Sequence, residues 1–112
     1  MQLLELFFQI KNSYVLQLRK LKEEHYISYI EALHNLASKN NDRDALSKYT
    51  YHRDKLFVVA SEEVIKNIVK YENEVIGKKS TVHDEYLTDI VRAIRTDLKI
   101  KDKDYPTISF KK

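Results

Sequence analysis

The side chains of this sequence that could do acid–base or metal chemistry are four histidines and the charged residues near them. Arg19 and His25 have five residues between them. A histidine can act as general base on a ribose hydroxyl while an arginine holds the phosphate. Glu31 and His34 have the spacing that puts a carboxylate and an imidazole on one metal in four-helix carboxylate proteins, but the second such pair that a metal site would need is missing. We therefore expect no metal and no cofactor.

The spacing of Arg19 and His25 resembles that of the helical nucleases called HEPN domains. That resemblance implies a ribonuclease in which this pair is catalytic, although Lys20 stands where the family usually has Asn or Asp. The interpretation we favour is that His25 fills a position on the apolar stripe of a helix bundle while Arg19 faces solvent. The HEPN-like ribonuclease stays as the alternative.

The eight tyrosines are the least ordinary part of the composition. A tyrosine has an apolar ring and a polar tip, so it suits either the edge of a small core or a surface that binds a protein partner. For the second role the sequence suggests an aromatic surface on the first helix. Its candidate residues are Phe7, Phe8, Tyr14, Tyr26 and Tyr29.

The composition indicates the fold that must position these residues. The chain has 112 residues, enough for one domain, with one Gly, one Pro and no Cys. All-β folds and phosphate-binding loops need more turn residues than this, and disulfides are excluded. We expect an all-α antiparallel bundle of about four helices with a long first helix. The predicted domain covers residues 1–100, and an irregular basic tail covers 101–112.

The charge of the chain argues against nucleic acid as a partner. The net charge of +3 is a small difference between 20 basic and 17 acidic side chains. No segment forms the basic stripe that displaces phosphate counterions, and the lysines of the tail are diluted by Asp102 and Asp104.

Residues 3–38 predict the first helix, because apolar side chains recur every three or four positions from Phe7 to Leu36. Such a helix is longer than the domain, so one end projects or the helix breaks near Asn12 and Ser13. We expect residues 1–10 to be the first turns of a buried helix. The alternatives are a juxtamembrane segment or an apolar face offered to a partner, and a dimer joined through this helix would cover its excess length.

Capping residues predict the boundaries of the later helices. Asn41 or Asp42 would cap the second helix, in which we favour helix over strand for residues 56–60. Ser61 would cap a third helix that runs to about Ile76 and ends at Gly77. Thr81 would begin a fourth helix that ends near Lys99.

Three stretches of the chain carry a second resemblance, namely residues 24–36, 56–65 and 90–98. Their order, with the helix start Ala60-Ser-Glu-Glu-Val64 and the final helix containing Ile94-Arg-Thr-Asp-Leu98, is similar to that in the cytoplasmic helical domain of small bacterial proteins of unknown function, which are often membrane-anchored. The resemblance covers residues 20–100. It implies a helical fold, a bacterial or phage origin and a place in the cytoplasm or at the inner face of the membrane. Within these motifs we expect Arg95 to bridge to a carboxylate on a neighbouring helix, and we also assign Asp97 a structural role.

These observations predict a non-enzymatic helical interaction module that binds a protein partner or itself. Nucleic acid is not an expected partner. A membrane would enter only through an upstream anchor or an anchored partner, because residues 1–10 are too short to span one.

Overall fold

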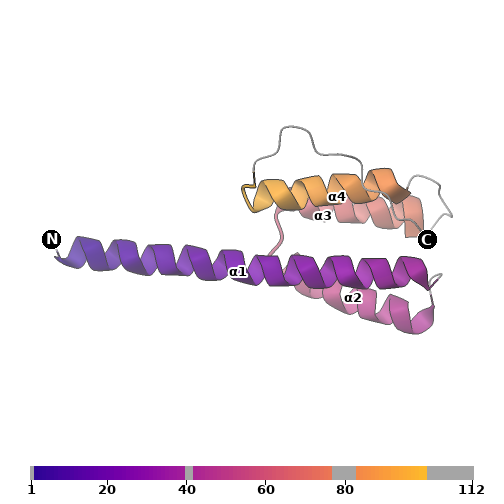
Figure 1. Cartoon of the computed structure of the whole chain (residues 1–112), viewed down its shortest axis with the longest axis horizontal. Helices are drawn as coiled ribbons and strands as arrows, with labels where there is room; N and C mark the ends of the chain where they lie inside the picture. Colours follow the sequence, from indigo (N-terminus) through magenta and orange to yellow (C-terminus); the bar gives the residue numbers. More distant parts are fainter. Residues whose placement is uncertain (1, 40–41, 77–82, 101–112) are drawn as a thin grey trace.

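The computed structural model describes residues 2–39, 42–76 and 83–100. Within them every regular element is a helix: α1 (Gln2–Ser38), α2 (Arg43–Phe57), α3 (Glu62–Tyr71), the π-helical turn η1 (Glu72–Ile76) and α4 (His83–Asp97). The predicted all-α fold with a long first helix is confirmed (Figure 1). The tail predicted for residues 101–112 lies outside the described residues.

Helix α1 runs for 37 residues without a break and projects from the bundle (Figure 1). At 1.5 Å per residue it is about 55 Å long, and the longest dimension of the molecule is 60 Å. Asn12 and Ser13 do not interrupt it, because neither costs a helix much and no Gly or Pro occurs between residues 2 and 38. All residues from 2 to 20 are exposed, and the first buried side chain is Tyr26.

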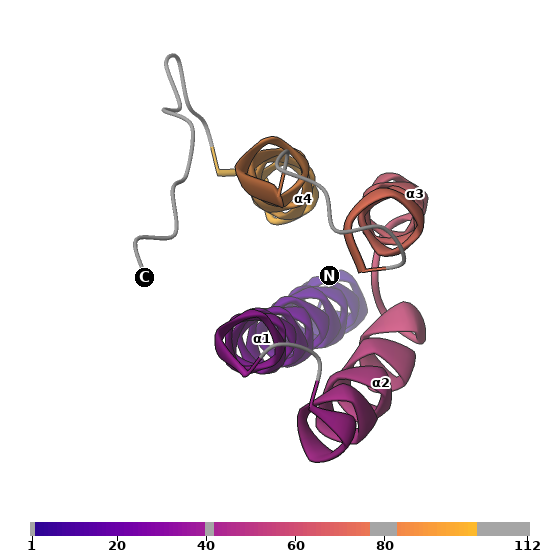
Figure 2. The ribbon, with the colours of Figure 1, turned by 90° about the vertical axis from the view of Figure 1, so that its right-hand side faces the viewer.

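The bundle consists of two helix pairs. Helix α1 packs along α2, and α3 packs along α4. Viewed end-on, the four helices occupy the corners of a square-like arrangement (Figure 2). The helices of different pairs approach each other less closely than those within a pair, so long side chains are needed to fill the space between the pairs.

Tyrosines provide much of this filling. Tyr29, Tyr49 and Tyr71 are the largest fully buried side chains. Aliphatic side chains from all four helices complete one continuous core around them, namely Leu33, Leu36, Leu56, Val64, Ile68, Leu87, Ile90, Ile94 and Leu98. Only the second half of α1 takes part in this core.

Short polar side chains begin α2 and α3. Asp42 accepts a hydrogen bond from the backbone N–H of Ala45 at 3.4 Å, and Ser61 accepts one from Val64 at 3.3 Å. Each bond satisfies one of the donors that a helix leaves free at its first turn. Between these two starts, α2 ends at Phe57 and the chain turns through residues 58–60, so the helix favoured for residues 56–60 is correct only as far as residue 57.

The predicted third helix is not uniform. Regular α3 stops at Tyr71, and the next five residues form the wider π-helical turn η1. Glu72, the first residue of η1, directs its carboxylate to Tyr49 and Arg53 of α2. The change of winding therefore occurs where a side chain bonds across to the other helix pair, a contact that periodicity alone does not reveal. The predicted caps Gly77 and Thr81 lie outside the described residues.

Helix α4 ends in a two-bond cap. Lys99 adopts a left-handed conformation with φ of 58°. Its N–H donates to the carbonyl of Thr96 at 3.0 Å, and the N–H of Ile100 donates to that of Arg95 at 2.8 Å. This is the Schellman arrangement, in which glycine is the usual left-handed residue.

Candidate interaction surface

The projecting half of α1, residues 2–20, is rich in large apolar side chains that the described residues do not cover. Phe7 is 64% exposed, Phe8 57% and Tyr14 66%. The other apolar side chains exposed along this segment are Leu3, Leu4, Leu6, Ile10, Val15, Leu16 and Leu18. The prediction that residues 1–10 begin a buried helix is therefore wrong for residues 2–10, because α1 extends beyond the reach of α2, α3 and α4 (Figure 1).

Six of the exposed apolar side chains continue the stripe that α1 uses to form the core, whereas Leu6 and Leu16 lie away from it. Inside the bundle this stripe holds Tyr26, Tyr29, Leu33 and Leu36. Steps of three and four residues toward the N-terminus lead from Tyr26 through Lys22 to Leu18, Val15 and Tyr14, and then through Lys11 to Phe8, Phe7 and Leu4. A mainly apolar face, interrupted by Lys22 and Lys11, thus runs the length of α1, covered in its second half and open in its first.

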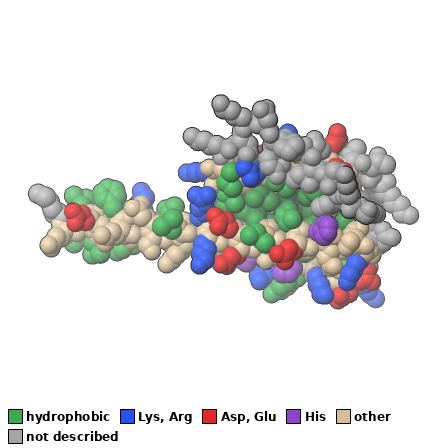
Figure 3. Space-filling model, in the orientation of Figure 1, with side chains coloured by type: hydrophobic (Ala, Val, Ile, Leu, Met, Phe, Trp, Pro, Cys, Tyr) green, Lys and Arg blue, Asp and Glu red, His purple; other side chains and the backbone are tan. Residues whose placement is uncertain are grey.

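The space-filling view shows the contrast between the two halves (Figure 3). Hydrophobic side chains are prominent along the projecting segment, where few charges appear, and Lys and Arg side chains gather where the helix enters the bundle (Figure 3). The segment carries Glu5 and Lys11 along most of its length, and Arg19 and Lys20 at its end.

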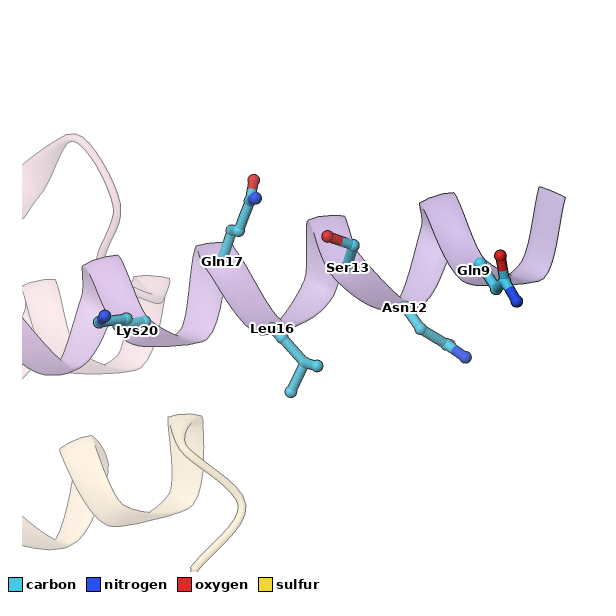
Figure 4. A pocket seen from close by; sticks show the side chains of 6 residues that line it. All are labelled: Gln9, Asn12, Ser13, Leu16, Gln17 and Lys20. Atoms are coloured by element: carbon cyan, nitrogen blue, oxygen red, sulfur yellow. The ribbon is translucent and has the colours of Figure 1, made fainter. Parts of the chain in front are cut away.

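The opposite face of the projecting segment is mainly polar (Figure 4). A shallow, open depression of about 420 Å³ lies along it, lined by Gln9, Asn12, Ser13, Leu16, Gln17 and Lys20. All six residues come from α1, so no second element encloses the depression. It is the surface of a single helix and not a ligand cavity.

Two residues of the aromatic surface proposed from sequence lie elsewhere. Tyr26 is 2% exposed and Tyr29 is 0% exposed, so both belong to the core and cannot contact a partner. The reason is their position beyond residue 20, where the same stripe faces α2 and α4. Phe7, Phe8 and Tyr14 lie on the open part of the stripe.

Tyr26 belongs to a polar cluster at the base of the projecting segment. Its hydroxyl donates to Asp97 of α4, and Lys22 donates to both oxygens of the same carboxylate at 3.1 Å. Burial raises the pKa of the Tyr26 hydroxyl above its usual range, and the hydrogen bond to Asp97 raises it further. Asp97 thus joins α4 to α1 at the point where α1 leaves the bundle.

A second polar cluster joins the two helix pairs through α2 and η1. Tyr49 donates to Glu72 at 2.8 Å, and Arg53 donates to both oxygens of Glu72 at 3.0 and 3.1 Å. The hydroxyls of Tyr29 and Tyr49 are 2.9 Å apart. Because the one proton of Tyr49 goes to the carboxylate, Tyr29 must be the donor to Tyr49.

The titration of these groups reflects their surroundings. Burial raises the pKa values of Tyr29 and Tyr49 well above the usual range of a phenol. Burial lowers the pKa of Arg53, but its bonds to Asp54 and Glu72 outweigh this and leave the pKa raised. All three side chains therefore keep a fixed protonation state near neutral pH, as structural groups do.

A third buried tyrosine contacts a histidine. The Tyr71 hydroxyl lies within hydrogen-bond distance of His83 Nδ1, and the two rings meet edge to face. Burial raises the pKa of Tyr71 above its usual range.

Sequence reasoning missed Lys22, Tyr49, Arg53 and Glu72 as members of the first two clusters, because each bond joins positions remote in sequence.

The proposed catalytic pair is not brought together by α1. Six positions on a helix correspond to one and two-thirds turns, so Arg19 and His25 point in different directions. Arg19 is half-exposed and bonds Glu23 through Nε at 3.2 Å, while His25 is partly buried on the stripe. The structure describes no cavity lined by both of them.

The described residues for which the sequence suggests a metal-binding or structural role lie on α1, at the start of α3 and on α4. Glu31 and His34 are exposed on α1, and the described part of the chain contains no cluster of three His, Cys, Asp or Glu that could hold a metal ion. Ser61 caps α3. Arg95 is partly buried on α4, and the salt bridge predicted for it stays a prediction.

Comparisons with protein families, with curated proteins and with solved structures find no match to this chain. Among the described residues, no helix combines the length and the apolar character that a membrane crossing requires.

Proposed function

We propose that this chain is a non-enzymatic interaction module that binds a protein partner, or itself, through the exposed half of α1. One observation carries the proposal: the apolar stripe that forms the core continues over residues 2–20 with its side chains open to solvent. Contiguous apolar patches of this kind are rare on monomeric proteins and mark interaction sites.

The physics of isolated helices supports the same conclusion. Most of the stability of a helix in a protein comes from tertiary contacts of its amphipathic face rather than from intrinsic propensity. The projecting segment has no such contacts within the described chain. A partner that covers the stripe would hold these turns and remove Phe7, Phe8 and Leu4 from water.

The test is capture with full-length tagged chain from cells that express it. Phe7→Gln combined with Phe8→Gln keeps good helix formers but breaks the stripe. Gln9→Ala combined with Asn12→Ala changes the polar face of the same turns and is the matched control. We expect a stoichiometric protein partner, or the untagged chain itself, to be lost with the first variant and kept with the second.

The ribonuclease alternative is checked in the same experiment by including samples treated with ribonuclease. Retention of the same partner by the Phe7/Phe8 variant would contradict the proposal. Recovery of RNA that disappears when Arg19 or His25 is replaced would instead favour the nuclease.

We further propose, on the resemblance of residues 20–100 alone, a bacterial or phage protein that works in the cytoplasm or at the inner face of the membrane. In that setting the exposed half of α1 would meet an anchored partner. Fractionation of cells that express the chain tests this, since a protein found wholly outside the cytoplasm and the inner membrane would contradict it.

A further inference from the structure

We propose that the partner of the exposed half of α1 is a second copy of this chain, bound antiparallel and centred on Lys11. This inference rests on the proposed function and deepens it by naming the partner and its orientation. Three features of the described segment support it: the symmetry of the stripe, the charges on its flanks and its area.

The apolar stripe is symmetric about Lys11. Its positions are 4, 7, 8, 11, 14, 15 and 18, which read the same in both directions. An antiparallel copy aligned on Lys11 therefore places an apolar side chain opposite every apolar side chain. The pairs are Leu4 with Leu18, Phe7 with Val15 and Phe8 with Tyr14, each formed twice around a two-fold axis.

The sizes of the paired side chains also favour this orientation. In the antiparallel pair, Phe7 meets the small side chain of Val15 and Phe8 meets Tyr14, and the two-fold axis repeats both pairs on the other side of Lys11, so the two ends of the contact have the same separation. A parallel pair would stack Phe7 and Phe8 on their own copies toward one end, and Tyr14 and the smaller Val15 on theirs toward the other. The two ends of the contact would then differ in width, and close packing along its whole length would be lost.

The flanks of the stripe distinguish the two orientations by charge. Glu5 and Arg19 lie roughly a quarter to a third of a turn to one side of Lys11, and Leu3 and Ile10 lie about a quarter turn to the other side. In an antiparallel pair, the charged flank of one copy meets the charged flank of the other, and the two apolar flanks also meet. Measured along the helix axis, Glu5 then lies within two residues of the partner's Arg19. In a parallel pair, the charged flank would meet the apolar flank, and each charge would lie level with its own copy.

Arg19 is positioned to make this second contact. It bonds Glu23 of its own helix through Nε at 3.2 Å and is half-exposed. A guanidinium has five N–H donors, so Arg19 can bridge Glu23 and the Glu5 of a second copy. Each dimer would contain two such bridges.

The available area is that of a stable dimer. The six apolar stripe positions together with Leu3 and Ile10 give eight large side chains, all of them exposed. At about 100 Å² for each large apolar side chain, they can bury about 800 Å² per copy, the size of a standard protein interface.

Lys11 lies at the two-fold axis of the proposed dimer. There it weakens the self-association of the chain but fixes the register of the two helices. Its flexible stem can cover apolar surface while the ammonium reaches water beside the helix pair. A single lysine within an apolar stripe is known to specify register and oligomeric state at a cost in stability. Lys11→Leu is therefore expected to tighten self-association at least tenfold.

Cysteine cross-linking of the full chain tests the orientation, because the sequence contains no cysteine. Lys11→Cys lies on the axis and should form a disulfide-linked dimer rapidly. Leu4→Cys and Leu18→Cys should each remain mostly monomeric alone, because each site is about 21 Å from its own copy along the helix. A mixture of these two variants, exchanged under reducing conditions and then oxidised, should give the Leu4–Leu18 heterodimer. Ser13→Cys, on the polar face, is the matched control and should not cross-link.

The outcomes separate this inference from the proposed function. Rapid dimerisation of Leu4→Cys alone would show a parallel pair and overturn the antiparallel arrangement, while self-binding through α1 would stand. Failure of Lys11→Cys to cross-link, together with a mass of 13.4 kDa by light scattering, would overturn the dimer. The proposed function would then depend on whether the Phe7/Phe8 variant loses a different protein.

A lipid surface could also cover the stripe, and a vesicle-binding experiment tests this. The probe is a set of vesicles of phosphatidylethanolamine and phosphatidylglycerol. A monomeric chain that sediments with these vesicles, and no longer does so after Phe7→Gln and Phe8→Gln, would overturn the dimer in favour of a membrane-surface helix.

Discussion

Replacing Tyr49 by Phe should destabilise the bundle more than replacing Tyr29 by Phe, although both hydroxyls share one hydrogen bond. The proton of Tyr49 goes to Glu72 at 2.8 Å, and Tyr29 donates to Tyr49 at 2.9 Å. The hydrogen bonds therefore run from Tyr29 to Tyr49 to Glu72, and Tyr49 is the residue that bonds two partners.

The expected magnitudes follow from that direction. Tyr29→Phe removes one neutral hydrogen bond and leaves Tyr49 donating to Glu72, which costs about 1 kcal/mol. Tyr49→Phe removes a bond to a carboxylate and leaves the hydroxyl of Tyr29, which is 0% exposed, without its acceptor. Each loss is worth about 1.5 kcal/mol, so the total is about 3 kcal/mol. Arg53 still holds Glu72 through two bonds, which limits the loss to this amount.

The double variant should be no less stable than Tyr49→Phe alone, because it also removes the stranded hydroxyl of Tyr29. Urea unfolding followed by circular dichroism at 222 nm measures the four free energies of unfolding in this cycle. Tyr51→Phe, at a ring that is 60% exposed, is the matched control and should change stability by less than about 0.5 kcal/mol. Equal effects of the two single changes, or additive effects in the double variant, would refute the directed chain of bonds.

Three further predictions concern titration and helix ends. Above pH 10 the stability should fall steeply, because buried tyrosines with raised pKa values stay protonated in the folded state while those of the unfolded chain ionise near pH 10. Each fully shifted tyrosine contributes a loss of about 1.4 kcal/mol per pH unit, and the four tyrosines concerned are Tyr26, Tyr29, Tyr49 and Tyr71. Tyrosinate absorbance at 295 nm should rise together with the loss of helix; ionisation of all eight tyrosines before any helix is lost would contradict this. Ser61→Ala should cost about 1 kcal/mol by removing the cap of α3, measured by urea unfolding against Ser47→Ala on exposed α2, and equal stability of the two variants would count against the cap. Lys99→Gly should raise stability by up to about 1 kcal/mol, because glycine adopts a positive φ without the steric cost that a side chain brings; a lower melting temperature would show that Lys99 does not hold this conformation in solution.

Local signals in the sequence were sufficient to predict the helices and several of their ends. Periodic apolar residues marked the long first helix, and the short polar side chains of Asp42 and Ser61 marked two helix starts. Both signals act within a few residues of chain, which is why a single sequence reveals them. The π-helical turn after Tyr71 was not predicted, because its stabilising partners Tyr49 and Arg53 lie about twenty residues away.

The sequence could not show which part of the first stripe is buried. The spacing from Phe7 to Leu18 is the same as that from Leu21 to Leu36, because a face that packs on a partner obeys the same helical period as one that packs on its own domain. Burial is decided instead by how far α2, α3 and α4 reach along α1. This is why Tyr26 and Tyr29 were grouped with Phe7 and Tyr14, although they lie in the core.

The polar clusters and the open stripe have complementary roles in this architecture. Apolar contacts are non-directional, and the two helix pairs approach each other less closely than the helices within each pair. Directional bonds from Asp97 to Lys22 and Tyr26, and from Glu72 to Tyr49 and Arg53, fix the position of one pair on the other. In the first of these clusters, Asp97 bonds Lys22, which lies within one turn of the point where the stripe of α1 becomes exposed. The bundle thereby holds the base of the projecting helix in one direction, and a segment held in this way loses less conformational freedom when a partner binds it than a free segment would.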